Sequence, residues 1–410
     1  MHRKERREMT VNREELLAAL RRVSASLDGR TFQPILRNAL LEAGDAGLRI
    51  TCTDLGTRTS VSVPGASDRA WAVTAPLKEL EKCSKALPKG DTVSLCLGDD
   101  GRLVVSSGRR EFTLRTLPAE DFPVRVSSEE GANREGEVDC GVLRDTLARV
   151  TWGASTDETC TVMCTVCFDD GQAIATDSRV LCGMPFAVPC LQGALLPAVA
   201  ADLMVGRVFA GLKGAVGVGV TLDADGKAPV TARFACGVVT FKARLVDGQF
   251  PNWRRIIELA TPPACRVTVT RDMLAFAKVA ALVDKAGNVK LDVPPGGGVL
   301  RLWTEGKDRP ACSEEFPLPE PAGEAHAAVG TGILLDVLGH AGEGSAWELP
   351  ELGLGERNLF RLTREDGWWC IGCVRLRDDP AFQEAKERLT SPPLDFDGEE
   401  ERPANGRPVL

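Results

Sequence analysis

A pattern that occurs three times at nearly equal spacing limits what this chain can fold into. The run Leu20-Arg-Arg-Val23 returns as Leu147-Ala-Arg-Val150 and as Phe276-Ala-Lys-Val279, and the first residues of these runs lie 127 and 129 positions apart. A Phe-Pro pair ends one unit at Phe122-Pro123 and another at Phe250-Pro251, 128 positions later. This period is too long for the stacked repeats of a solenoid. It predicts one α+β domain plan used three times, and each unit reads helix, strands, helix, strands.

Stretches without hydrophobic periodicity separate these units. We expect a disordered charged leader at 1–8, a first domain at 9–128, a linker at 129–136, a second domain at 137–262, a third domain at 263–376 and an acidic, proline-rich disordered tail at 377–410. Hydrophobic periodicity predicts helices within 11–26, near 77–87 and at 196–212, and strands at 160–168 and 172–176.

Composition restricts the classes of function. The chain has 410 residues, of which 43% are hydrophobic and 26% charged, and a formal net charge of −8. These values describe a globular protein, not one that coats nucleic acid with its whole surface. There is no tyrosine and there are three histidines, so histidine-based catalysis has few candidates. The sequence shows no secretory signal and no membrane-spanning apolar run, so we expect a reducing, cytoplasmic compartment.

Fourteen cysteines include two Cys-x-x-Cys pairs, Cys164/Cys167 and Cys370/Cys373. Zinc ribbons place such pairs on tight turns. Both pairs here lie in strand-like sequences, where residues i and i+3 face opposite sides. We therefore expect free thiols, no metal and no cofactor. A thiol enzyme or zinc protein that uses these pairs is an alternative, and it requires a thiol of low pKa.

Residues 241–257 pass from a strand-like pattern through a proline corner to a patch of aromatic, basic and aliphatic residues. Alternating apolar residues at 241–245 predict a strand, which Asp247-Gly248 ends. The Phe250-Pro251 pair then makes a stiff corner, because proline restricts both its own φ and the residue before it. An aromatic, basic and aliphatic patch follows at Trp253–Ile257. This patch is either a hairpin end packed on a core or a surface where a partner peptide docks.

Eight short motifs then occur in a fixed order along the chain. They are Asp28-Gly-Arg30, Pro34-Ile-Leu36, Thr53-Asp-Leu55, Leu117-Pro-Ala-Glu-Asp-Phe-Pro123, Ala175-Thr-Asp-Ser-Arg179, Met184-Pro185, Leu245-Val-Asp-Gly-Gln-Phe-Pro251 and Val374-Arg-Leu376. In this order, and with the threefold repeat, the chain resembles the bacterial DNA polymerase III beta subunit, the replication sliding clamp. The resemblance covers residues 10–376.

The resemblance implies an architecture and a function. Each domain would pack two helices on antiparallel sheets, and two chains would close head to tail into a ring around duplex DNA. Such a ring is a non-catalytic processivity factor that tethers the replicative polymerase and works in the cytoplasm at the nucleoid. Its partners would be double-stranded DNA of any sequence, a second copy, the catalytic subunit of DNA polymerase III, a clamp loader and other proteins with clamp-binding motifs, without a membrane. A clamp-like interaction protein that no longer encircles DNA is the alternative.

The resemblance also implies three sets of site residues. The DNA-binding set is Arg30, Arg21, Arg22, Lys78, Lys82, Lys85, Arg149 and Lys278. The partner-peptide pocket, between the second and third domains, is Met163, Thr176, Arg179, Val180, Pro251, Arg255, Ile256, Cys370, Gly372 and Cys373. The dimer interface pairs Phe112 and Leu114 of one chain with Ala281 and Leu282 of the other.

Two departures from the family pattern are visible. The Thr176–Val180 loop is shortened, and Gly372-Cys373-Val374 replaces a methionine-rich end, which indicates a divergent pocket because methionine surfaces adapt to many partners. The tail also continues for 34 residues beyond Leu376 and contains Leu394-Asp-Phe396. This tail is either a solvated acidic segment, the reading we favour, or a segment that visits the partner pocket.

Overall fold

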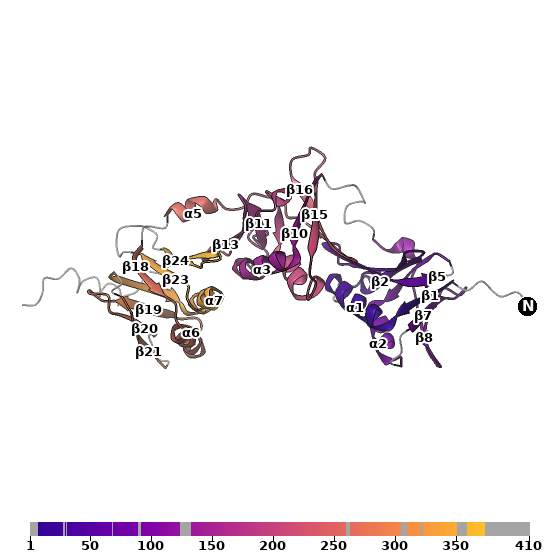
Figure 1. Cartoon of the computed structure of the whole chain (residues 1–410), viewed down its shortest axis with the longest axis horizontal. Coiled ribbons are helices and arrows are strands. Elements are labelled where there is room, and N and C mark those ends of the chain that lie inside the picture. The colour runs from indigo at the N-terminus through magenta and orange to yellow at the C-terminus, as the bar shows by residue number, and fades with distance from the viewer. Residues whose placement is uncertain are drawn as a thin grey trace, which may run out of the picture.

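The chain forms a shallow arch of three lobes (Figure 1). This computed structural model describes residues 7–373, except 28, 30, 68, 89–91, 124–132, 260–262, 305–309, 321–322 and 351–358. Helices α1, α2, α3, α6 and α7 lie toward the concave side of the arch, and α5 lies on the opposite side.

Each lobe repeats one order of elements: a strand, a helix, four strands, a helix and three strands. The first unit contains β1 (Arg7–Asn12), α1 (Arg13–Val23), β2 (Asn38–Gly44), β3 (Gly47–Thr53), β4 (Thr57–Val63), β6 (Trp71–Pro76), α2 (Leu77–Ala86), β7 (Thr92–Leu97), β8 (Leu103–Ser107) and β9 (Arg110–Leu114), with a short additional strand β5 (Gly65–Ser67).

The second unit follows the same order. It contains β10 (Arg134–Asp139), α3 (Cys140–Val150), β11 (Thr165–Asp169), β12 (Gln172–Thr176), β13 (Val180–Pro185), β14 (Leu195–Pro197), α4 (Ala198–Leu203), β15 (Ala215–Leu222), β16 (Pro229–Cys236) and β17 (Val239–Arg244). Helix α4 continues into a π-helical segment, Met204–Val208, and α5 (Trp253–Leu259) connects this unit to the next.

The third unit contains β18 (Pro263–Thr268), α6 (Arg271–Asp284), β19 (Asn288–Val293), β20 (Val299–Thr304), β21 (Ser313–Pro317), β22 (Ala325–Gly330), α7 (Thr331–Ala341), β23 (Ala346–Pro350), β24 (Leu359–Thr363) and β25 (Trp369–Cys373). The prediction of a three-unit α+β fold, with two helices on antiparallel sheets in each unit, is confirmed. The prediction missed the strand that begins each unit.

Local sequence explains where the helices begin. The Asn12 side chain accepts hydrogen bonds from the backbone N–H groups of Glu14 and Glu15, at 2.9 and 3.1 Å, and so caps α1. Asp139 caps α3 in the same way, and Thr270 caps α6. These side chains satisfy N–H groups that the first turn of a helix leaves without a partner. The strand–cap–helix order is therefore repeated three times at the level of single residues.

Every unit contributes its strands as two half-sheets of four, to which β5 adds a fifth strand in the first unit. The middle half-sheet holds the four strands between the two helices, and the flanking half-sheet holds the first strand and the last three. Within a chain, the flanking half-sheet of one unit joins the middle half-sheet of the unit before it. This produces two eight-stranded sheets, in the orders β10-β15-β16-β17-β4-β3-β2-β6 and β14-β11-β12-β13-β25-β24-β23-β18.

Two half-sheets lie at opposite ends of the arch (Figure 1). They are the flanking half-sheet of the first unit, in the order β5-β1-β7-β8-β9, and the middle half-sheet of the third, in the order β21-β20-β19-β22. Strand β9 occupies the position of β17 and β25 in the other units, and β21 occupies the position of β4 and β13. Within the described residues, β9 and β21 are thus edge strands where their equivalents are paired.

Tryptophans connect the second and third units on the side of the helices. The indole N–H groups of Trp152 and Trp368 both donate to the backbone carbonyl of Arg149, at 2.8 and 3.1 Å. The Trp152 ring also stacks on His340 of α7, with ring centroids 4.4 Å apart. Trp368 is fully buried, so its indole joins the two units inside the core, whereas His340 of the ring stack is exposed.

Several predicted boundaries were wrong. Arg7 and Glu8 are not a leader, because they belong to β1 and pair with Leu97 and Cys96 of β7. Residues 134–136 of the predicted linker pair with β15. Short charged sequences look disordered by a hydrophobicity criterion, but a strand pairs through its backbone whatever its side chains.

The predicted strand at 160–168 begins only at Thr165, after a series of turns, and the predicted helix at 196–212 ends at Val208. The residues beyond Cys373, which include the Val374-Arg-Leu376 motif and the predicted tail, lie outside the described residues.

We predict that Gly372→Ala destabilises the junction between the second and third units by about 1–3 kcal/mol, the usual cost of overpacking a core. A Cβ on Gly372 would overlap the ring of Phe360, which is fully buried. Urea unfolding monitored by tryptophan fluorescence measures the change. The matched control is Gly339→Ala in α7, where a Cβ meets nothing within 4 Å, and which should leave stability equal or higher. Equal stability of both variants would contradict the packing described.

Candidate functional site

Helix α5 and the corner before it form a separate apolar cluster on the outer face of the second eight-stranded sheet. Its buried members are Ile174, Leu181 and Trp253, and Phe250, Ile256, Ile257 and Trp369 pack against them. The Trp253 and Trp369 rings stack with centroids 6.1 Å apart. Because Trp369 belongs to the last strand of the third unit, this cluster spans the junction between the second and third units.

Asp169 fixes the orientation of α5. Its Oδ2 accepts hydrogen bonds from the Trp253 indole and the Arg254 guanidinium, at 2.9 and 2.8 Å, and its Oδ1 accepts one from Gln192 at 2.6 Å. Burial acts to raise the pKa of the Asp169 carboxyl, but these hydrogen bonds outweigh it and hold the pKa below its ordinary value. The Arg254 guanidinium also lies over the Trp253 ring, 4.5 Å from its centroid.

The loop between β12 and β13 is a tight turn beside this cluster. The Thr176 hydroxyl donates to the carbonyl of Val180 at 2.7 Å, and the Asp177 carboxylate accepts from the backbone N–H groups of Arg179 and Val180, both at 2.8 Å. Ser178 has a φ of 73°, which short polar residues tolerate better than most. The Arg179 guanidinium pairs with the Asp177 carboxylate at 2.9 Å. The shortened loop therefore keeps its arginine in an ion pair within the loop.

The structure divides the predicted pocket residues between two faces of the sheet. Ile256 lies in the outer cluster, whereas Val180 and Cys370 belong to the core on the other face. Gly372 points toward Phe360 of that core. Pro251 and Met163 are half-buried and Arg255 is exposed. The side chain of Cys373 lies outside the described residues.

Sequence reasoning did not assign the outer-face residues Ile174, Leu181 and Trp369 to the site. Leu181 and Trp369 directly adjoin Val180 and Cys370, which were assigned. Because successive side chains of a strand point to opposite faces, the period-two pattern was the signal that could have identified them.

The predicted DNA-binding residues fall into two groups. Arg21, Lys78, Lys82, Lys85 and Lys278 are exposed on α1, α2 and α6, although Lys85 also pairs with Glu81 at 2.6 Å. Arg22 instead donates to the carbonyls of Val208 and Ala210, at 2.6 and 3.1 Å, and so joins the first unit to the end of the π-helical segment. Arg149 pairs with Asp366 at 3.5 Å. Arg30 lies outside the described residues.

The predicted dimer residues lie at the two ends of the arch. Phe112 is half-buried and Leu114 buried in the edge strand β9. On α6, Ala281 is half-buried and Leu282 is 86% exposed, and Val279, one turn earlier, is 48% exposed. An exposed aliphatic pair on one helix face is unusual for a surface that meets only water.

The thiols of Cys167 and Cys370 have the opposite character from that of a reactive cysteine. Burial raises the pKa of Cys167 to about 12 and also raises that of Cys370. A nucleophilic or metal-binding thiol needs a lowered pKa. Across the part of the chain that the structure describes, no group of three or more histidine, cysteine, aspartate or glutamate residues is arranged to hold a metal ion. Among the described helices, none has the length and apolar character to cross a membrane.

Comparison with known proteins agrees with this architecture. The model of the N-terminal domain of the DNA polymerase III beta subunit matches residues 7–126. The beta sliding clamp of Caulobacter vibrioides is 30% identical over 350 residues, which are 81% of this chain and 90% of that protein. The solved beta sliding clamp of C. crescentus superposes with a TM-score of 0.77 at 26% identity, covering 91% of this chain and 99% of that one. A Bacillus subtilis clamp structure has a TM-score of 0.79 at 17% identity, covering 90% and 99%.

The three repeated units and the shared eight-stranded sheets define a clamp-type protein. The chain belongs to the bacterial beta sliding clamp family, the beta subunits of DNA polymerase III.

We predict that Asp169→Asn loosens α5, because the amide places an N–H donor where the carboxylate only accepts. Losing such charge-assisted hydrogen bonds costs about 1–3 kcal/mol, which hydrogen exchange of the amides at 253–258 measures. The folded-state pKa of Asp169 is lowered, so its contribution is present above the ordinary carboxyl pKa and is lost as the pH falls through the folded-state value. The protection factors of these amides, which compare the exchange rate with that of an unfolded peptide at the same pH, should therefore fall in acid in the wild type, and the variant should lose that dependence.

The matched control is Asp170→Asn. Asp170 is 67% exposed and pairs with the same Arg254 at 3.2 Å. This substitution should change exchange little, because exposed ion pairs contribute little. An Asp169→Asn variant with wild-type exchange at neutral pH would show that Asp169 does not hold α5.

Proposed function

We propose that this protein is a non-catalytic DNA sliding clamp, a homodimeric ring that encircles duplex DNA and tethers the replicative polymerase. The single observation that carries the proposal is the pairing rule of the half-sheets. Inside the chain, β17 pairs antiparallel with β4, and β25 pairs antiparallel with β13. The equivalent strands β9 and β21 lie at opposite ends of the arch, so the same rule applied between two chains pairs β9 with β21 of the other copy.

A head-to-tail dimer satisfies this rule twice. Two chains related by a twofold axis bring each β9 against the other chain's β21, which removes both open sheet edges and closes the ring. The exposed Val279 and Leu282 of α6 lie in the unit that carries β21, where the contact would cover them. Phe112 and Leu114 of β9 would supply the facing apolar side chains.

The concave side suits loose binding of DNA. Helices from all three units lie there (Figure 1), and the exposed Arg21, Lys78, Lys82 and Lys278 would contact phosphates without reading bases. The net charge of −8 leaves the rest of the surface acidic overall, which favours DNA in the hole. Arg22 and Arg149 would contribute mainly by holding units together.

The surface formed by α5 and the Thr176–Val180 turn is the proposed docking site for short peptides of partners. These partners would be the catalytic subunit of DNA polymerase III, a clamp loader and other proteins with clamp-binding motifs, acting at the nucleoid in the cytoplasm. The exposed Arg255, together with the apolar cluster around Ile256 and Trp253, supports a peptide that offers aliphatic or aromatic anchors.

Retention on circular DNA tests encirclement. The protein, loaded onto a nicked plasmid by a clamp loader, should co-elute with the circle in salt that removes simple DNA binders, and should dissociate after one enzyme cuts the circle into a line. A ring slides off free ends, whereas a groove binder does not distinguish the two forms. Equal retention on both forms would favour the clamp-like interaction protein that does not encircle DNA.

Sedimentation tests closure. Leu282→Asp should shift the dimer to monomer, because it places a carboxylate in an apolar contact. The control is Val238→Asp, since Val238 is 57% exposed in the turn between β16 and β17, away from both ends. A Leu282→Asp variant that stays dimeric at micromolar concentration would exclude this interface.

A further inference from the structure

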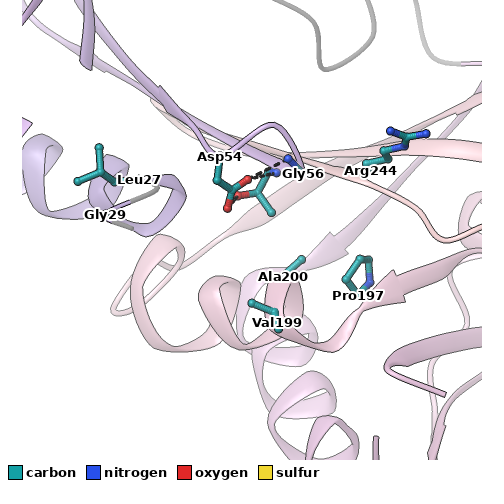
Figure 2. A pocket seen from close by; sticks show the side chains of 9 residues that line it. Leu27, Gly29, Asp54, Gly56, Pro197, Val199, Ala200 and Arg244 are labelled. Carbon is teal, nitrogen blue, oxygen red and sulfur yellow. Dashed lines mark hydrogen bonds between the residues drawn. The ribbon is translucent and has the colours of Figure 1, made fainter. Parts of the chain in front are cut away.

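A cavity of about 490 Å³ lies at the other junction, between the first and second units (Figure 2). Its walls come from the end of α1, the turn between β3 and β4, the start of α4 and the end of β17. The lining residues are Leu27, Gly29, Asp54, Gly56, Thr57, Pro197, Val199, Ala200 and Arg244. This volume is in the range that protein cavities use for small ligands or single peptide side chains.

One wall of the cavity is aliphatic and open. Val199 is 71% exposed at the start of α4, and Leu55, in the neighbouring turn, is 46% exposed. Pro197 and the buried Ala200 adjoin Val199, and the half-buried Leu27 comes from the segment after α1 in the first unit (Figure 2). Exposed aliphatic side chains beside a concave surface indicate a place that another apolar group covers.

The cavity is bordered by two cations, Arg244 and Lys78, and by one anion, Asp54. The Asp54 carboxylate faces its own turn, because it accepts hydrogen bonds from the backbone of Gly56 and from the backbone and hydroxyl of Thr57. Arg244, by contrast, is exposed and makes no ion pair with any of the residues that the structure describes. Its backbone N–H donates to the Gly56 carbonyl at 2.8 Å. The Lys78 amine lies beside Gly29, where an added Cβ would be 3.5 Å from it.

The tail of this chain carries the complementary chemistry. Leu394 and Phe396 are its apolar pair, and five carboxylates lie on or near them, at Asp395, Asp397, Glu399, Glu400 and Glu401. On the surface around α5, Arg254 and Arg179 are paired with aspartates, whereas Arg255 is exposed. The cavity at the first junction offers both an open aliphatic wall and an arginine without an ion pair among the described residues.

The tail starts close enough to reach this cavity. Strand β25, from which it leaves, and strand β14, which ends at the cavity wall in Pro197, belong to one sheet and are four strand positions apart. At about 4.8 Å per strand, that separation is about 19 Å across the sheet. The 21 residue steps from Cys373 to Leu394 can span up to about 70 Å when extended.

We propose that the segment Leu394–Asp397 docks in the cavity between the first and second units, with Leu394 or Phe396 against Val199 and the carboxylates toward Arg244 and Lys78. The tail then covers an aliphatic surface that the fold leaves open. This docking place is separate from the surface around α5. This inference does not depend on the ring, because the cavity and the tail belong to one chain.

The test is photo-crosslinking within the full-length protein. Phe396 is replaced by p-benzoylphenylalanine, the protein is irradiated, and the crosslinked peptides are identified by mass spectrometry. We expect crosslinks to peptides containing Val199 or Leu27, and we expect Val199→Asp to reduce their yield at least about fivefold. Val142→Asp is the matched control, since Val142 is 51% exposed on α3 and does not line the cavity, and the yield should not change.

A second variant guards against a folding defect. Arg244→Gln should also lower the yield, whereas Arg233→Gln, on the neighbouring strand, should leave it unchanged. Crosslinks that map to Trp253 or Ile256, that are insensitive to both cavity variants, or that do not form within the protein would overturn the proposal.

Hydrogen exchange gives an independent readout. In the full-length chain, Leu394→Ser with Phe396→Ser should accelerate exchange of the amides at 198–203 at least about threefold, because their cover is removed. Exchange at 253–258 should not change. Unchanged exchange at 198–203 would overturn the proposal as well.

Discussion

Backbone pairing between neighbouring units is the interaction on which the rest of the structure depends. The outer strand of a flanking half-sheet has unpaired backbone groups that would bind other chains. The chain pairs these groups by joining the flanking half-sheet to the middle half-sheet of the preceding unit. This joining keeps the units in a fixed relative orientation, places the helices on one side of the arch and creates both junction surfaces. It also leaves one flanking and one middle half-sheet open at the ends, and the proposed ring follows from those two.

The two junctions are built alike and differ in what fills them. At each, a turn with the same hydrogen bonds stands beside the joining strand: the hydroxyls of Thr53 and Thr176 donate to the carbonyls of Thr57 and Val180, both at 2.7 Å. The third residue of each turn has a positive φ, 74° at Leu55 and 73° at Ser178. At the second junction α5 packs an apolar cluster on the outer face of the sheet, and Asp169 holds it in place. At the first junction a cavity stays open beside Val199. One repeated plan therefore provides two different surfaces.

Much of the fold was predictable because it depends on local pattern. The recurring Leu-Ala-Arg-Val type of run identified three units, and amphipathic spacing placed α1 and α2 within a few residues. The misses have common causes. Arg7 and Glu8 look like a leader because β1 pairs through its backbone. The helix predicted at 196–212 ends at Val208, where Arg22, distant in sequence, binds the Val208 carbonyl. For the partner-peptide site, the family resemblance predicted a location near Ile256. The face of the sheet to which Val180, Cys370 and Gly372 point depends on strand register.

The sequence alone determined the threefold plan, the class of fold and the resemblance to the clamp family, because repeats and alternation are properties of neighbouring residues. The tertiary structure decided which basic residues stay exposed and which, like Arg22 and Arg149, hold units together. It also decided that Trp253 and Trp369 stack across a junction and that Arg244 and Val199 border an open cavity. These features arise between segments far apart in the chain, where pairing register and packing, not local propensity, set the distances.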